Sequence, residues 1–324
     1  MSQFRRDPVT GEWNIIAEER SNRPYHFNHN AEAEKCPFCV GNEKMTPNEV
    51  TRINDKDGWS IRVVPNKFPA VCQKSTEIRE EAFYSSCEGT GRHEVIIETP
   101  EHNVALHQLD THGIYQVLTV YQHRFIELSQ LEHIKYVQIF KNHGREGGAS
   151  LPHSHSQVVA LPFIPPRIEL EIANAQKYFE ETGSCVFCDI IAKELQDKKR
   201  IVYSNNHFII AAAYAPRFAY EMLIIPRLHQ EAFHNANEEI LHELADALKN
   251  LFNKMVAVLG EFPYNLVLHT DCYLSSSSTY HWHMELIPRN SHHAGFEIAT
   301  GSCINTMSPE KAAENLTKKQ REIK

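Results

Sequence analysis

The chain has 324 residues, of which 42% are hydrophobic and 23% charged, a globular composition with room for two domains. A formal net charge of −8 without long runs of Lys or Arg argues against a nucleic-acid partner. The sequence has no run of about 18 apolar residues and no signal-peptide pattern at its start. We therefore expect no membrane partner and a cytoplasmic location.

The first third of the chain alternates short apolar strands with polar loops. A turn and a short strand lead into a loop that carries Arg20 and Arg23, which taken alone are typical of a solvated surface. Residues 61–64 and 93–98 alternate in the manner of strands. Between them we expect a loop of low hydrophobicity over about 73–92.

From Asp110 onward the apolar residues follow the spacing of a helix. Ile114, Phe125 and Leu131 belong to an apolar stripe that continues for about five turns. Residues 136–140 return to the pattern of a strand. Strand, helix and strand joined by short connections predict an α+β fold, in which an antiparallel sheet has helices packed on it.

Residues 144–162, GREGGASLPHSHSQVVALP, form the next predicted strand and the loop before it. His153, His155 and Gln157 alternate, so a strand would place these polar side chains on one face. The loop can turn its backbone N–H groups inward as an anion-binding nest. Its residues are Gly144, Gly147, Gly148 and, with a hydroxyl, Ser150. The pattern favours a phosphate cradle before a histidine nucleophile, although a single His-x-His also occurs as surface histidines or metal ligands.

The second half of the chain repeats this order at a nearly constant spacing. His102 and His229, each next to a strand end, lie 127 residues apart, and His153 and His281 lie 128 apart. The two Cys-x-x-Cys pairs are 149 residues apart, a difference that unequal loops would absorb. We infer an internal duplication. It predicts two tandem domains, residues 1–170 and residues 171–324.

The duplication gives each half one set of candidate metal ligands. The first set is Cys36, Cys39, His102 and His153. The second set is Cys185, Cys188, His229 and His281. A zinc ion closed by four protein ligands has no open position for chemistry, so we predict two structural zinc sites. Free buried thiols beside incidental histidines, or a redox role for a cysteine pair, are the alternatives.

If the first histidine of each motif binds metal, His155 and His283 remain. The first half has a glycine-rich loop before its motif, whereas the second has a serine-rich segment and the bulky Trp282 between its histidines. We therefore take His155 as the catalytic candidate and leave the role of His283 open. A neutral imidazole whose second nitrogen is held by a hydrogen bond can attack an α-phosphorus.

Four segments resemble the galactose-1-phosphate uridylyltransferase family of the histidine-triad superfamily. They are RRDPVTGEW, CPFC, HSHSQ after its glycine-rich loop, and GFEIATG at 295–301. The resemblance extends over about residues 4–316. It implies two histidine-triad-like α+β domains, a homodimer, and ping-pong transfer of a nucleoside monophosphate through a covalent histidine intermediate.

By position, the resemblance implies that His155 is the nucleophile and that Gln157 steadies the nucleotidylated histidine. Ser150 and Asn142 match positions that hold phosphates. The predicted catalytic residues are therefore His155, Gln157 and Ser150. The predicted substrate-binding residues are Arg20, Arg23, Asn66, Asn142, Gly147 and Gly148.

The sequence departs from the uridylyltransferase pattern in two places. Ser154 stands where the family usually has proline between the histidines. Cys185, Cys188 and His229 resemble the second zinc site of the plant branch that acts as an ADP-glucose phosphorylase, not the glutamate- and histidine-based site of bacterial uridylyltransferases. The segment FEETGSC resembles that branch too. The base of the nucleotide therefore stays open.

The first functional hypothesis is a hexose-1-phosphate nucleotidylyltransferase that uses UDP-glucose and galactose 1-phosphate. The runner-up uses ADP-glucose with phosphate as acceptor. A nucleotide hydrolase and a non-catalytic, zinc-stabilised nucleotide-binding protein are alternatives from other classes. Gln157 favours transfer to a sugar phosphate over transfer to water, because a third histidine there would instead resemble the hydrolase branches.

Overall fold

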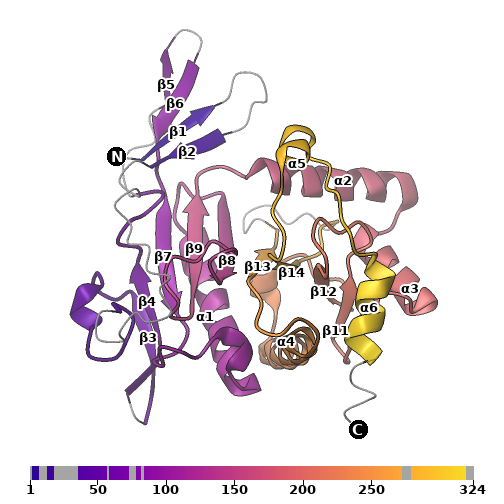
Figure 1. Cartoon of the computed structure of the whole chain (residues 1–324). Helices are drawn as coiled ribbons and strands as arrows, with labels where there is room; N and C mark the ends of the chain where they lie inside the picture. Colours follow the sequence, from indigo (N-terminus) through magenta and orange to yellow (C-terminus); the bar gives the residue numbers. More distant parts are fainter. Residues whose placement is uncertain are drawn as a thin grey trace.

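A ten-stranded antiparallel sheet runs through the molecule (Figure 1). The computed structural model describes residues 2–6, 13–17, 36–56, 58–72, 78–81, 84–271 and 279–318. The strands, in their order across the sheet, are β10 (Ile201–Ser204), β11 (Phe208–Ala212), β12 (Met222–Pro226), β14 (His283–Pro288), β13 (Tyr264–His269), β8 (Tyr136–His143), β9 (His155–Leu161), β7 (Arg92–Ile97), β4 (Gly58–Pro65) and β3 (Thr51–Asp55).

The two halves of the chain contribute one half of the sheet each. From one edge of the sheet to its middle, the first half contributes β3, β4, β7, β9 and β8. From the other edge to the middle, the second half contributes the corresponding strands in the same order, β10, β11, β12, β14 and β13. The halves join where β8 pairs with β13 antiparallel, with Asn142 opposite Asn265. The predicted α+β fold with an antiparallel sheet is confirmed. This repeated strand order is what a duplication predicts, while the duplication itself and the boundary at residue 170 stay predictions.

Two long helices cover the same face of the sheet, α1 (Thr111–Ser129) and α4 (Glu238–Leu259) (Figure 1). Each begins after a capping side chain, since Asp110 accepts from the N–H of Gly113 and Asn237 from that of Ile240. Phe125 and Phe252 lie in the core between the helices and the sheet. The apolar stripe predicted from Asp110 is thus the buried face of α1, although Leu131 lies beyond the end of the helix.

The expected loop over 73–92 is wrong for its described part, which contains strands. A small sheet has the order β2 (Trp13–Ile16), β1 (Gln3–Arg6), β6 (Tyr84–Glu88) and β5 (Ile78–Glu81). The sequences of β5 and β6, IREE and YSSCE, contain few apolar residues. Their polarity therefore gave no strand signal, and only their pairing with each other and with β1 makes them strands.

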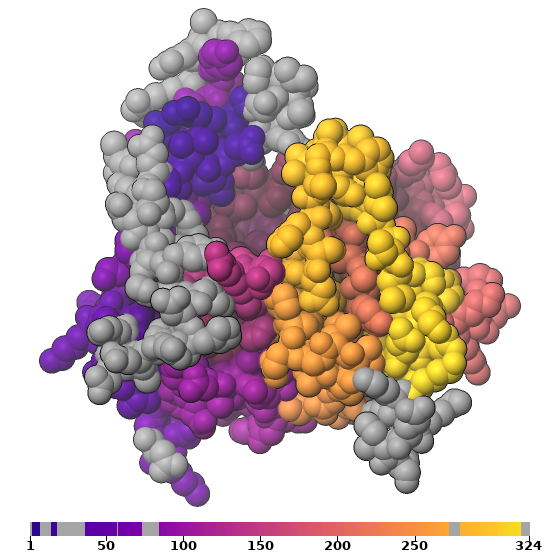
Figure 2. Space-filling model, viewed as in Figure 1, coloured from indigo at the N-terminus to yellow at the C-terminus, as the bar shows by residue number. Residues whose placement is uncertain are grey.

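The remaining elements are shorter or lie at the outside of the second half. They are α2 (Pro166–Thr182), α3 (Val186–Asp197), α5 (Gly295–Thr300), α6 (Pro309–Lys318) and the 3₁₀ helices η3 (Glu43–Met45), η4 (Leu106–Gln108) and η5 (Phe233–Asn235). Figure 2 shows the C-terminal residues, in yellow, on the surface of the second half, where α6 contacts β10, β11 and α4. Within the described part of the chain, no helix has the length and apolar character needed to cross a membrane.

Candidate active site and metal clusters

Along strand β9, successive side chains of the motif region point to opposite faces of the sheet. His155 and Gln157 lie on the face away from α1, while Ser156 contacts Tyr121 of α1 on the other face. All seven residues of β9 are buried, because the strand lies between β7 and β8. His153 precedes the strand instead of belonging to it, so the expectation of one strand through all three polar residues needs this correction.

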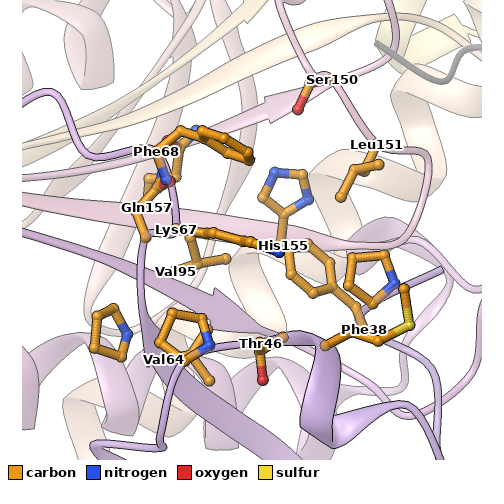
Figure 3. Close-up of a pocket in the computed structure, with 15 residues that line it drawn as sticks. Phe38, Thr46, Val64, Lys67, Phe68, Val95, Ser150, Leu151, His155 and Gln157 are labelled. Carbon is orange, nitrogen blue, oxygen red and sulfur yellow. The ribbon is translucent and has the colours of Figure 1, made fainter. Parts of the chain in front are cut away.

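A cavity of about 220 Å³ lies against β9 and is lined by four of the predicted site residues. They are Asn66, Ser150, His155 and Gln157. Figure 3 shows the ring of His155 in the middle of the lining side chains. Much of the remaining lining is apolar and includes Phe38, Val64, Phe68, Val95 and Leu151. Val64, Phe68 and Val95 lie outside the motifs, so no motif in the sequence could have identified them.

Of the predicted residues of the glycine-rich loop, Ser150 lines the cavity, whereas Gly144, Gly147 and Gly148 do not. The side chain of Asn265 donates both to Asn142 Oδ1 at 2.8 Å and to the carbonyl of Gly147 at 2.7 Å. A Cβ on Gly147 would lie 2.2 Å from the carbonyl oxygen of His143, so close packing requires glycine there. Gly148 has a positive φ of 83°. Arg20 and Arg23 lie outside the described residues.

His155 has a hydrogen bond that fixes the position of its proton. Its Nδ1 lies 2.8 Å from the carbonyl oxygen of His153. A carbonyl only accepts, so Nδ1 carries the proton and Nε2 carries the lone pair. The ring is 4% exposed and packs against Phe38, with ring centroids 5.4 Å apart. This is the tautomer that a histidine needs to attack phosphorus through Nε2.

His93, which the sequence did not point to, orients Gln157. The backbone N–H of Ala70 donates to His93 Nδ1 at 3.0 Å, so the ring proton lies on Nε2. His93 Nε2 in turn lies 2.9 Å from Gln157 Oε1 and donates to it. Gln157 can therefore offer its NH₂ group to a phosphate oxygen. The alternation of residues 93–98 could have shown the face of His93, but not the register that brings it to Gln157.

Replacing His93 by phenylalanine is expected to lower the rate of transfer about 10-fold, because the amide of Gln157 loses the bond that orients it. A double-mutant cycle with Gln157→Ala measures this directly. In the Gln157→Ala background, His93→Phe should have little further effect on the rate, because both changes act through the same amide. Fully additive losses would show that His93 acts by another route.

The first Cys/His cluster brings together the four residues predicted for the first half. Cys36, Cys39, His102 and His153 each offer one ligand atom, and these atoms all lie within 4.8 Å of one another. Cys39 Sγ is 3.2 Å from His102 Nδ1 and 3.6 Å from His153 Nδ1. Burial lowers the pKa of His153 to about 4, which keeps the imidazole in the neutral, metal-binding form.

The second cluster has the same composition and geometry. It consists of Cys185, Cys188, His229 and His281. Cys188 Sγ lies 3.5 Å from His229 Nδ1 and 3.7 Å from His281 Nδ1. The histidine rings are nearly perpendicular in both clusters, with centroids 5.5 Å apart for His102 and His153 and 5.1 Å for His229 and His281.

Both clusters fit a tetrahedral metal ion. Zn–S and Zn–N bonds of about 2.3 and 2.0–2.1 Å imply sulfur-to-nitrogen separations of about 3.5 Å, close to those observed. In each cluster, one histidine uses its second ring nitrogen, Nε2, to donate to a backbone carbonyl. His153 Nε2 donates to Thr99 at 2.8 Å, and His281 Nε2 donates to Pro226 at 3.0 Å. Such outer hydrogen bonds orient histidine ligands. These are therefore clusters that could bind metal.

A third histidine group lacks that outer hydrogen bond. His107, His143 and Glu261 also place ligand atoms within 4.8 Å of one another. Among the described residues, however, Nδ1 of His107 is buried without a hydrogen-bond partner, while its Nε2 faces Glu261 at 3.1 Å. The group therefore fits a metal ion less well than the two Cys/His clusters do.

The second half holds charged groups where the first half has its cavity. His283 repeats the bond of His155, with Nδ1 3.2 Å from the carbonyl of His281, but its ring stacks on His269 at 4.7 Å. Glu285, the counterpart of Gln157, pairs with Arg217 at 2.5 Å. Although burial alone would lower it, a hydrogen bond to Glu171 and the nearby carboxylate of Glu285 raise the pKa of His269 to about 9. This buried charge cluster favours His155 as the catalytic histidine.

A histidine of fixed tautomer that lines a cavity together with a serine and an amide, two residues after a member of a Cys/His cluster, is an arrangement suited to nucleotidyl transfer. Comparison of the chain with known proteins leads to the same class of enzyme. The family model described as "Galactose-1-phosphate uridyl transferase, N-terminal domain" matches residues 1–165. A second model, for a domain of unknown function (DUF4921), matches residues 90–324.

Two relatives and one solved structure are similar over nearly their whole lengths. ADP-glucose phosphorylase of Arabidopsis thaliana is 35% identical, over 96% of this chain and 91% of its own. Galactose-1-phosphate uridylyltransferase of Thermotoga maritima is 30% identical over 100% of both. The crystal structure of an Arabidopsis thaliana ADP-glucose phosphorylase with bound ADP-glucose has a TM-score of 0.79 and 33% identity, over 98% of each chain.

The chain belongs to the galactose-1-phosphate uridylyltransferase family, as its motifs implied. It is accordingly a nucleotidyltransferase.

Proposed function

We propose that the chain transfers a nucleoside monophosphate from a nucleotide sugar to a phosphate-bearing acceptor through a covalent intermediate on His155. The observation that carries this proposal is the hydrogen bond between His155 Nδ1 and the carbonyl of His153, at the wall of a cavity that also contains Ser150 and Gln157. It supports a neutral nucleophile with its lone pair on Nε2.

In the first step, His155 Nε2 attacks the α-phosphorus of the nucleotide sugar. A P–N bond forms and the P–O bond to the β-phosphate breaks, so the sugar 1-phosphate leaves. In the second step, a phosphate oxygen of the acceptor attacks the same phosphorus and the P–N bond breaks. Ser150 and the NH₂ group of Gln157, which line the same cavity, would bind the negatively charged α-phosphate oxygens and position them for in-line attack.

We also propose that both Cys/His clusters hold structural zinc. Four protein ligands would leave zinc no open position, so its contribution is to fix backbone and not to activate water. In the first cluster, which consists of Cys36, Cys39, His102 and His153, the metal would hold His153, two positions before the proposed nucleophile. Burial raises the pKa of the Cys39 thiol to about 12, so metal binding would displace its proton.

Two nucleotide sugars are candidates. Uridylyl transfer from UDP-glucose to galactose 1-phosphate is supported by the family model and by the full-length similarity to the Thermotoga maritima enzyme. Adenylyl transfer from ADP-glucose to phosphate is favoured by a specific observation, the second Cys/His cluster with Cys185 and Cys188, and by the similarity to the Arabidopsis thaliana phosphorylase.

A set of six mixtures, which combine two donors with two acceptors or no acceptor, tests the proposal. UDP-glucose and ADP-glucose are each mixed with galactose 1-phosphate, inorganic phosphate or neither, and the products are measured. We expect one donor–acceptor pair to dominate kcat/KM by at least about 100-fold, because each base needs its own pocket contacts. Release of free nucleoside monophosphate at the same rate without acceptor would indicate a hydrolase. No product in any mixture would indicate a binding protein.

We further propose a homodimer of chains that each contain two tandem domains, residues 1–170 and 171–324. Exposed apolar side chains on the C-terminal segment support the dimer, namely Phe296, Ile298 and Ile304, which are 53%, 78% and 68% exposed. The repeated strand order supports the domains. The free thiols of the seven described cysteines agree with a cytoplasmic location. Sedimentation analysis of the full chain, with Ile298→Glu as the disrupting variant, tests the dimer.

A further inference from the structure

The face of β9 opposite the cavity carries a group of buried polar side chains that the proposed reaction does not use. Ser154 and Ser156, which flank His155, extend toward this face and meet side chains of β8, of α1 and of the segment after β7. Each side chain of this buried polar network is no more than 3% exposed. Its members are Glu98, Tyr121, Lys141, Ser154 and Ser156.

The network supplies a hydrogen-bond acceptor for each N–H donor of the buried Lys141 ammonium group. Lys141 Nζ has three donors, and three acceptors are in reach: Glu98 Oε2 at 2.5 Å, Ser154 Oγ at 3.0 Å and the carbonyl oxygen of His155 at 3.2 Å. Ser154 donates to the same carboxylate at 2.5 Å, and Ser156 donates to its other oxygen. Burial alone would raise the pKa of Glu98, but the ion pair with Lys141 holds that pKa below its usual range.

Two residues of the network bind the backbone of the His-x-His motif directly. The carbonyl of Ser154 accepts from the N–H of Glu98 at 3.2 Å, and the carbonyl of His155 accepts from Lys141. The carbonyl between His153 and Ser154 is the one that accepts the Nδ1 proton of His155. The carbonyls of His153, Ser154 and His155 thus each accept a hydrogen bond, and the one to His155 comes from the Lys141 side chain of the network.

The second half shows that this fold does not need an ion pair beneath such a motif. There Trp282 lies between the two histidines, fully buried against Phe208 and Phe233. A buried ion pair loses hydration that an apolar side chain does not lose, so it adds little net stability. Among the described residues, the ion pair lies beneath His155 while apolar side chains surround Trp282 at the corresponding place in the second half, a difference that points to a role in holding geometry. Position 154 is also where the family usually has proline, whose ring fixes the backbone angle φ, and the serine found here lacks that ring.

We propose that the buried polar network is a positioning device for His155, which holds residues 153–155 so that Nδ1 of His155 donates to the carbonyl of His153 and Nε2 keeps its lone pair. Lys141, Glu98 and Ser154 are thus positioning residues, not catalytic ones. This inference rests on the proposed function of His155 as the nucleophile.

Two variants of the full, metal-loaded chain test the inference. Ser154→Ala removes one hydroxyl, and the double variant Glu98→Gln with Lys141→Met removes both charges together so that neither remains buried alone. Ser129→Ala, another buried serine, is the matched control. Single-turnover mixing with UDP-glucose or ADP-glucose gives the rate of intermediate formation and the donor concentration for half-maximal rate. Nitrogen-15 NMR of the histidine rings gives the tautomer of His155.

We expect the rate of intermediate formation to fall about 10- to 100-fold in both variants, with the half-maximal donor concentration within about 2-fold of wild type. The NMR spectrum should show His155 losing its single tautomer in the same variants. Ser129→Ala should match the wild type in both measurements. A structural role alone would lower the melting temperature without moving the tautomer or the rate.

Wild-type rates and an unchanged tautomer in Ser154→Ala and the double variant would overturn the inference. If the double variant does not fold, Ser154→Ala decides, since it removes only a hydroxyl. If the wild type forms no intermediate with either donor, the proposed function fails and the tautomer alone decides the positioning role. An unchanged tautomer in the variants then overturns that role as well.

Discussion

The variant His155→Asn is expected to lose transfer activity by about 10⁴-fold or more, because asparagine cannot replace the proposed nucleophile of the covalent intermediate. Asparagine keeps an N–H that can donate to the carbonyl of His153, which now lies 2.8 Å from Nδ1. The fold and the affinity for the nucleotide sugar should therefore change little. Steady-state kinetics, the melting temperature and equilibrium binding of the donor separate these effects.

The matched control for this variant is His283→Asn, the same change at the corresponding position of the second half. His283 lies in the charge cluster of His269 and Glu285, so its loss should affect stability more than transfer. Transfer above about 1% of the wild-type rate in His155→Asn would exclude His155 as the sole nucleophile. Equal losses in the two variants would assign no special role to the first half.

The variant Cys36→Ser is expected to lose one equivalent of zinc and a large part of the stability of the first half. Removing one of four ligands weakens a site whose metal binding contributes folding free energy, about 10–16 kcal/mol for zinc in small zinc-finger peptides. Because His153 belongs to the same cluster and precedes His155 by two residues, transfer should fall with the metal. Metal analysis, thermal unfolding and kinetics on the purified chain measure the three effects.

Two further cysteine variants separate a metal role from a general need for thiols. Cys72→Ser changes a free cysteine outside both clusters and should keep the metal content and the activity. Cys188→Ser should also lose one equivalent of zinc, but with a smaller loss of transfer, since its cluster precedes His283 and not His155. Full metal content in Cys36→Ser, or equal losses of transfer in Cys36→Ser and Cys188→Ser, would contradict this account.

The parts of the site that follow a short period or a repeat could be predicted from the sequence. The spacing of 128 residues between His153 and His281 led to both Cys/His clusters, whose eight members lie together as predicted. The alternation of His155 and Gln157 placed both on one face of β9, beside the same cavity. In both cases the spacing along the chain sets the placement of side chains directly, through strand periodicity or duplication.

The parts that depend on register between distant strands could not be predicted. His93 reaches Gln157 because β7 pairs with β9 in a particular register, and hydrophobic patterns do not specify that pairing. Lys141 and Glu98 meet beneath Ser154 for the same reason. The predicted substrate-binding residues Asn142 and Gly147 bond to Asn265 of the second half, across a junction between β8 and β13 that no motif marks.

The site of covalent modification tests the central claim most directly. The full chain is mixed with UDP-glucose or ADP-glucose without acceptor, digested at neutral pH and analysed by peptide mass spectrometry with fragmentation. The account predicts one uridylyl or adenylyl group on the peptide that contains HSHSQ, located on His155 and removed when galactose 1-phosphate or phosphate is added. An unmodified peptide with both donors, or a nucleotidyl group on another residue, would contradict it.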